Sequence, residues 1–96
     1  MGQKNYFVYI LTNHLKTVLY IGVTNDLPRR IIEHKDRRGS EFASRYQLTS
    51  LVYYEETTDV LVAIQREKSI KGLLRYRKVG LINSFNPKWK VLSEDI

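Results

Sequence analysis

Two β-prone runs separated by a short connection near the start of the chain most constrain its fold. The first run contains Phe7-Val8-Tyr9 and the second contains Tyr20-Ile21-Gly22. Runs of apolar and aromatic residues bounded by turn-forming residues favour β-strands, and a short connection favours an antiparallel hairpin. We therefore expect strands over Tyr6–Thr12 and Val18–Val23 that pair with each other.

The register of this hairpin decides how its two tyrosines lie. If Thr12 pairs with Thr17 across the loop Asn13-His14-Leu15-Lys16, Tyr9 lies directly opposite Tyr20. Directly opposed residues project from the same sheet face, with Cβ atoms roughly 5 Å apart. Two adjacent phenols are either ordinary cross-strand packing partners or part of a functional site. The residues that follow favour the second interpretation.

A helix that carries an arginine and a histidine is expected directly after the second strand. Asn25-Asp26 supplies a capping side chain, and the helix should extend over Leu27–Asp36. Arg30 and His34 are four residues apart, so they share one face of this helix. A phenol, a guanidinium and an imidazole on adjoining elements suit phosphate chemistry.

These residues resemble the signature of the GIY-YIG nuclease family. Phe7-Val8-Tyr9 corresponds to the first motif of the family and Tyr20-Ile21-Gly22 to the second. The resemblance extends over about Tyr6 to Leu92. It looks closest to the small stand-alone members related to the N-terminal nuclease domain of UvrC, the bacterial excision-repair incision subunit. It implies a single domain over residues 1–96.

The resemblance also implies a set of site residues. Arg30 matches the catalytic arginine of the family, and His34 matches its frequent histidine one turn later. The implied catalytic residues are Tyr9, Tyr20, Arg30 and His34, and the implied ligand of Mg²⁺ or Mn²⁺ is Glu67. One of the two tyrosines would orient or deprotonate the attacking water, which requires a nearby cation to lower its pKa.

Glu67 also has support from the helical pattern around it. A helix is expected from Val60 to about Leu74, and Glu67 falls where a core residue belongs. A buried carboxylate is unfavourable unless it is neutral, ion-paired or bound to a cation, and Arg30 or Lys71 could be the ionic partner. The apolar stripe that Glu67 interrupts consists of Val60, Ala63, Ile64, Ile70 and Leu74.

The rest of the chain completes an α/β domain of the α+β type. We expect a short helical turn over Ser40–Tyr46, a third strand over Leu48–Glu56 and a final helix over Tyr76–Asn83. The predicted fold is a small three-stranded antiparallel sheet flanked by helices. The first two strands should be neighbours, and the pattern leaves the remaining strand order open.

Two positions depart from the family pattern. Phe7 replaces the first glycine of the family name. In UvrC-type domains an asparagine follows a Pro-basic-aromatic step, and the position after Pro87-Lys88-Trp89 is Lys90. Asn83 and Asn86 lie nearby in the sequence and could take its place.

The charge of the chain favours a polyanionic partner. Sixteen Lys and Arg residues against ten Asp and Glu give a net charge of +6. Basic clusters bind polyphosphate through counterion release, and tyrosines among them can stack on bases, although a solubilising surface has the same composition. The expected nucleic-acid-binding residues are Arg29, Lys35, Arg37, Arg38, Arg45, Lys71, Arg75, Arg77 and Lys78.

Several classes of protein do not fit the composition. The chain has no cysteine, which excludes disulfides and thiolate chemistry, and it has no apolar run of the roughly 18 residues that a membrane helix needs. We expect a cytoplasmic, metal-dependent endonuclease that acts on DNA in repair or processing, as a monomer or weak dimer. The alternatives are a nucleic-acid-binding module without efficient cleavage and a subunit whose basic face docks an acidic protein.

Overall fold

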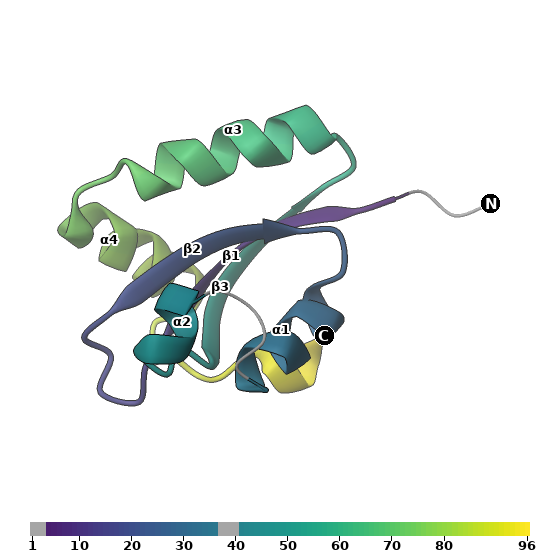
Figure 1. The fold of residues 1–96 in the computed structure, drawn as a ribbon. Helices are drawn as coiled ribbons and strands as arrows, with labels where there is room; N and C mark the ends of the chain where they lie inside the picture. The colour runs from purple at the N-terminus through teal and green to yellow at the C-terminus, as the bar shows by residue number, and fades with distance from the viewer. Residues whose placement is uncertain (1–3, 37–40) are drawn as a thin grey trace.

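A three-stranded antiparallel sheet with helices on both faces forms the domain (Figure 1). The computed structural model describes residues 4–36 and 41–96. The strand order is β2-β1-β3, so the predicted α+β fold and the pairing of the first two strands are confirmed. The elements are β1 (Tyr6–Thr12), β2 (Leu19–Thr24), α1 (Leu27–Lys35), α2 (Glu41–Arg45), β3 (Ser50–Thr57), α3 (Val60–Lys71), α4 (Arg75–Phe85) and a 3₁₀ turn at Ser93–Asp95.

The sheet separates two apolar layers, because its central strand is buried on both faces. Val8 and Ile10 of β1 belong to the layer that α3 and α4 cover. Tyr9 and Leu11 belong to the opposite layer, where α1 and α2 pack. Figure 1 shows α3 on one side of the sheet and α1 on the other. Tyr9 and α3 therefore lie on opposite faces of the sheet, and a single site could include both only at an edge of the sheet.

The hairpin register differs by two residues from the predicted one. Tyr9 pairs with Gly22 and Tyr20 pairs with Leu11, so the expected pairing of Tyr9 with Tyr20 is wrong. The connection is longer than expected because the Asn13 side-chain oxygen accepts hydrogen bonds from the backbone of residues 17 and 18, at 2.8 and 3.2 Å. A shift of two residues keeps every side chain on its face. Both tyrosines still project from one face, now as diagonal neighbours.

Side-chain caps define where α1 and α3 begin. Asp26 accepts a hydrogen bond from the Arg29 backbone at 3.1 Å at the start of α1. Asp59 does the same for Leu61 at 2.9 Å at the start of α3. At its other end α3 stops at Lys71, short of the predicted Leu74, and α4 extends beyond the predicted Tyr76–Asn83 at both ends.

The buried face of α3 is narrower than the predicted stripe. Ala63 and Ile70 are fully buried, whereas Val60, Ile64 and Leu74 are exposed. The predicted stripe is therefore wrong at three positions, because apolar residues occupy several sides of this helix. Positions 63, 67 and 70 follow the helical spacing and face the sheet, and Glu67 occupies the middle of this line. Among the described residues, no helix is long and apolar enough to span a bilayer.

Candidate active site

A hydrogen-bonded group of three side chains lies between β1 and α1. The hydroxyl of Tyr9, which is fully buried, lies 3.0 Å from Nε2 of His34. Nε of Arg30 donates to the same hydroxyl at 3.3 Å. Arg30 and His34 reach Tyr9 together because they are one turn apart on the helix that packs over this sheet face. The structure thus brings together three of the residues predicted from the sequence.

Gly22 makes room for Tyr9 on the neighbouring strand. A Cβ atom built on Gly22 would lie 2.5 Å from both Cζ and the hydroxyl oxygen of Tyr9. Such contacts are closer than any real Cβ atom shows, so only glycine permits this ring position. Gly22 is a residue of the site that the predicted set does not include. An isolated glycine inside a strand pattern was the available signal, since it marks a close approach to the backbone.

Tyr20 adjoins the group and is its more accessible phenol. Its ring centroid lies 6.3 Å from that of Tyr9 and 5.4 Å from that of His34, with the histidine in an edge orientation. Tyr20 is half-buried, whereas Tyr9 has no exposed surface. Molecules arriving from solvent can therefore contact Tyr20 but not Tyr9.

Burial controls the protonation of the group. Burial raises the pKa of Tyr9 to about 12, even though the hydrogen bond from Arg30 acts in the opposite direction. Burial, assisted by the Arg30 charge, lowers the pKa of His34 to about 4. The hydrogen bond to Tyr9 raises the pKa of Arg30 further above its usual range. At neutral pH the group consists of a neutral phenol, a neutral imidazole and a guanidinium ion. The lowered pKa that deprotonation of water by a phenol requires is therefore not found at Tyr9.

The direction of the hydrogen bonds follows from these protonation states. Arg30 can only donate, so the Tyr9 oxygen accepts from Arg30, and we infer that its own proton is directed to Nε2 of neutral His34. The remaining imidazole proton is then on Nδ1. This atom is buried and has no hydrogen-bond partner within the described residues.

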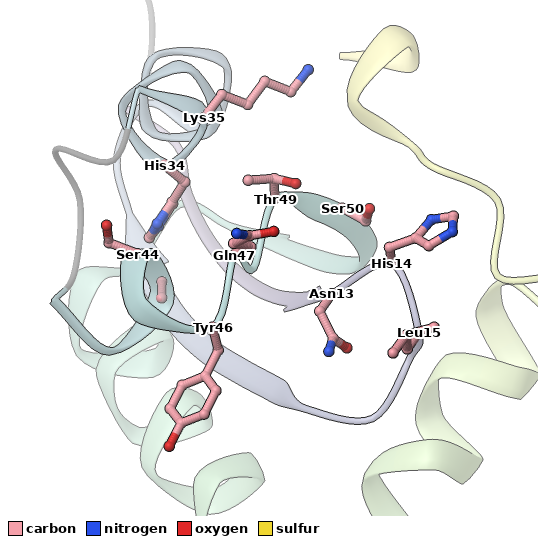
Figure 2. Close-up of a pocket in the computed structure, with 11 residues that line it drawn as sticks. Asn13, His14, Leu15, His34, Lys35, Ser44, Tyr46, Gln47, Thr49 and Ser50 are labelled. Atoms are coloured by element: carbon pink, nitrogen blue, oxygen red, sulfur yellow. The ribbon is translucent and has the colours of Figure 1, made fainter.

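A polar pocket of about 480 Å³ lies beyond His34. Figure 2 shows His34 and Ser44 on one side of it and His14, from the β1–β2 loop, on the opposite side. Lys35, a predicted nucleic-acid-binding residue, also lines this pocket. The ring of Tyr46 points away from the other labelled side chains (Figure 2).

Glu67 forms an ion pair with Lys71, one of the two partners expected from the sequence, and is not bonded to the Tyr9 group. Its side chain is 13 % exposed, and its carboxylate lies 3.2 Å from Nζ of Lys71, which is 64 % exposed. In the described part of the chain, no hydrogen bond or ion pair joins Glu67 to the Tyr9 group. Lys71 and Tyr20 nevertheless line one hollow of about 440 Å³, together with Leu19, Ile21, Phe42 and Lys78. This hollow extends around the β2 edge and connects the two faces of the sheet.

The other predicted nucleic-acid-binding residues are distributed over several surfaces. Arg29 is exposed and lies 4.0 Å from Asp26. Nη2 of Arg75 donates to the backbone oxygen of Lys16 at 3.2 Å. The guanidinium of Arg77 lies 5.6 Å from the centre of the Tyr76 ring, and Arg45 is exposed at the end of α2. The predicted residues Arg37 and Arg38 lie outside the described part of the chain.

The two asparagines considered as replacements for the family asparagine hold the C-terminal segment. Asn86 is buried, and its amide donates to the backbone oxygens of Val52 at 3.0 Å and Lys90 at 2.8 Å. The Asn83 oxygen accepts a hydrogen bond from Nε1 of Trp89 at 2.6 Å. Both amides therefore have structural partners, and Lys90 itself is exposed.

Comparison with known proteins identifies the family that the chain matches and several of its relatives. Residues 5–79 match the GIY-YIG catalytic domain. A UPF0213 protein of Clostridium perfringens is 34% identical over 90 residues, which cover 94% of this chain and 96% of that protein. A UPF0213 protein of Natronomonas pharaonis is 33% identical over 78 residues (81% and 91%), and one of Staphylococcus epidermidis is 32% identical over 80 residues (83% and 96%). No solved structure matches the chain.

Proposed function

The chain belongs to the GIY-YIG family, and from this premise we propose that it is a metal-dependent endonuclease that hydrolyses phosphodiester bonds in DNA, in repair or processing. The observation that supports the proposal most is the contact of Arg30 and His34 with one buried phenol, Tyr9, beside the accessible phenol of Tyr20. This arrangement presents a cation and a hydroxyl to a phosphate at the same place. The net charge of +6 supports a polyanionic substrate.

Arg30 is the group that would stabilise negative charge on the phosphate. Its side chain is 29% exposed, and its guanidinium is held by Tyr9 on one side and by Glu33, at 3.1 Å, on the other. A guanidinium fixed in this way needs little reorganisation when charge develops on a non-bridging oxygen. In the free protein, the Glu33 carboxylate already accepts a hydrogen bond from one of the guanidinium nitrogens of Arg30. A phosphate would compete with Glu33 for these donors.

The two tyrosines would have different tasks. Tyr9 has no exposed surface, so it acts as a positioning residue that orients Arg30 and His34. Tyr20 is the phenol that a water molecule or a phosphate can reach, and we assign the contact with the attacking water to it. His34 is neutral at neutral pH and accepts a hydrogen bond from the Tyr9 hydroxyl, so it positions the phenol and does not bind phosphate as a cation.

The surroundings of Glu67 fit a divalent cation held by one carboxylate. Among the described residues, no group of three or more His, Cys, Asp or Glu could hold a metal ion. A cation at Glu67 would take its other ligands from water and phosphate oxygens, as Mg²⁺ commonly does. When bound, it would supply Lewis-acid stabilisation of the leaving oxygen. The carboxylate is available for this because its partner, Lys71, is exposed and can swing away.

A nucleic-acid-binding module without efficient cleavage is the second candidate. Lys90 occupies the position of the family asparagine, and the Asn86 amide is already hydrogen-bonded to the backbone oxygens of Val52 and Lys90. Such a module would bind DNA with the salt dependence of a basic surface and would leave the strand intact. The two candidates differ in one measurable property, which is strand scission that depends on a divalent cation.

The deciding experiment is a titration of Mg²⁺ and Mn²⁺ with single-stranded, nicked and branched DNA. We expect cleavage that rises with metal concentration, that Glu67→Ala abolishes, and that Glu94→Ala leaves unchanged. Glu94 is a suitable control because it is an exposed carboxylate in the C-terminal segment. Binding without cleavage at every metal concentration would favour the second candidate. Equal cleavage by Glu67→Ala and the parent would exclude the metal role of Glu67.

A further inference from the structure

Three aromatic rings form a continuous series that leads from the candidate site to the surface. The Phe42 ring is stacked against Tyr20 with an interplanar angle of 25° and a centroid distance of 6.5 Å. The Tyr46 ring follows, 4.8 Å from Phe42. Phe42 is on α2 and Tyr46 directly follows its last residue; the Tyr46 backbone N–H donates to the Phe42 carbonyl oxygen at 3.2 Å, so the helical spacing continues and both rings project from the same side.

The outer two rings are unusually accessible for their size. Phe42 is 47% exposed and Tyr46 is 44% exposed, whereas Tyr9, at the inner end of the cluster, is fully buried. Packing of the core does not require Phe42 or Tyr46, because neither ring belongs to the buried layer beneath α2. The nuclease site described above does not use them either. The exposed surfaces of these two rings are therefore available to a ligand.

Two cations border the same series of rings. Lys71 of α3 and Lys78 of α4 line the hollow that contains Tyr20 and Phe42. A ligand that fits this hollow must combine a flat aromatic surface with negative charge. A nucleotide meets both requirements, because its base can stack on Phe42 while its phosphate lies near the lysines.

We propose that Phe42 and Tyr46 form a stacking platform for an unpaired base adjacent to the cleaved phosphate, so that the substrates are single-stranded or locally unpaired. This inference rests on the proposed nuclease function. A base within a duplex is stacked between its neighbours and cannot offer its face to a protein ring. An unpaired base can, and stacking of this kind tolerates any sequence because every base has a π face. The platform therefore selects the structure of the substrate and not its sequence.

The test measures binding in the absence of divalent cations, so that cleavage does not interfere. The probes are a single-stranded oligonucleotide that contains one 2-aminopurine and a hairpin duplex with the same number of phosphates. Stacking should quench 2-aminopurine fluorescence in the parent protein. We expect Phe42→Leu to remove the quenching and to weaken single-strand binding roughly 5- to 150-fold, with duplex binding unchanged. Tyr46→Leu should act in the same direction and gives a second reading if Phe42→Leu fails to fold.

The matched control is Phe85→Leu. Phe85 is 48% exposed but lies against Tyr53 and Tyr54 of β3, remote in the fold from α2. Equal effects of the Phe42 and Phe85 variants, or equal weakening of single-strand and duplex binding, would overturn the platform. Cleavage assays with Mg²⁺ separate the two proposals. Retained cleavage without Phe42-dependent stacking overturns the platform alone, and Phe42-dependent stacking without any cleavage supports the platform while it contradicts the nuclease function.

Discussion

The ring of Tyr9 lies across the backbone of Gly22, its direct partner in the pairing of β1 with β2. This contact allows the Tyr9 hydroxyl to pass over the neighbouring strand toward His34 and Arg30. The motif Tyr20-Ile21-Gly22 thus contributes to the site in two different ways. Tyr20 supplies a phenol, and Gly22 supplies the empty space that the phenol of the first motif occupies.

Gly22→Ala should therefore disturb both stability and the site. The added methyl group would lie 2.5 Å from the Tyr9 ring, so the ring must move or the strands must separate. Overpacking of a core typically costs about 1–3 kcal/mol in the free energy of unfolding, and we expect a loss in this range together with a loss of cleavage. Urea unfolding and a cleavage assay measure the two effects. Gly80→Ala is the control, because a Cβ at Gly80 meets nothing within 4 Å. A Gly22→Ala protein with parent stability would contradict the contact.

Phenylalanine replacements should separate the roles of the two tyrosines. Tyr9→Phe leaves the buried His34 and the Arg30 guanidinium without their shared partner, so it should lower the free energy of unfolding by about 1–3 kcal/mol as well as the cleavage rate. Tyr20→Phe removes a hydroxyl at the hollow and should reduce the rate with little change in stability. Thermal unfolding and single-turnover cleavage distinguish these outcomes. If both variants cleave at the parent rate, the tyrosines are packing residues and the proposed mechanism is wrong.

Adjacent arginines on α1 allow a matched test of the phosphate contact. Arg30→Ala removes a preorganised cation and should reduce the cleavage rate on the order of a hundredfold or more, with a smaller effect on DNA binding. Arg29→Ala removes the same charge from an exposed neighbouring position and should leave the rate nearly unchanged. Rate constants at saturating DNA provide the measurement. Similar losses in the two variants would indicate a general charge effect in place of a specific contact.

The buried His34 should make the domain less stable in mild acid. Its pKa is about 4 in the folded protein, below the ordinary value of 6.5, so only the unfolded chain binds a proton between these values. The free energy of unfolding should then fall by about 2 kcal/mol between pH 7 and pH 5, a window above the ordinary range of carboxylates.

His34→Gln should flatten this profile, since glutamine does not titrate. Replacement of the exposed His14 by glutamine should leave the profile of the parent. Urea unfolding at several pH values compares the three proteins. Parallel profiles for the parent and His34→Gln would show that burial of His34 does not control the pH dependence.

The strands, the helices and most of the site could be predicted because local patterns specify them. The strand Tyr6–Thr12 and the start of α1 at Leu27 agree with the structure, since alternation and a capping aspartate act within a few residues. The hairpin register could not be predicted, because it depends on how the Asn13 side chain bonds to the backbone of its own loop. The error of two residues in the register did not affect the prediction that Tyr9 and Tyr20 share a face, because a shift of two residues leaves every side chain on the same face of its strand.

Other features depend on how the elements pack. The stripe predicted for α3 was wrong at several positions because Val60, Leu61, Val62 and Ile64 place apolar residues on several sides of the helix, and the structure exposes all four. The pKa of Tyr9 depends on the depth of burial, which no local pattern reports. The ion pair of Glu67 with Lys71, which lines the hollow at the β2 edge, likewise depends on how α3 packs.

Tyr9, Tyr20, Arg30 and His34 come from one hairpin and the helix that follows it, whereas Glu67 comes from an element much later in the chain. Contacts of short sequence separation close small loops and form early in folding. The phenol and guanidinium part of the site can thus assemble from a local segment, before α3 docks on the other face of the sheet. Slow or partial docking of α3 would then leave a protein that has the proposed phosphate contacts and lacks only Glu67, so that folding defects in α3 would resemble loss of the proposed metal.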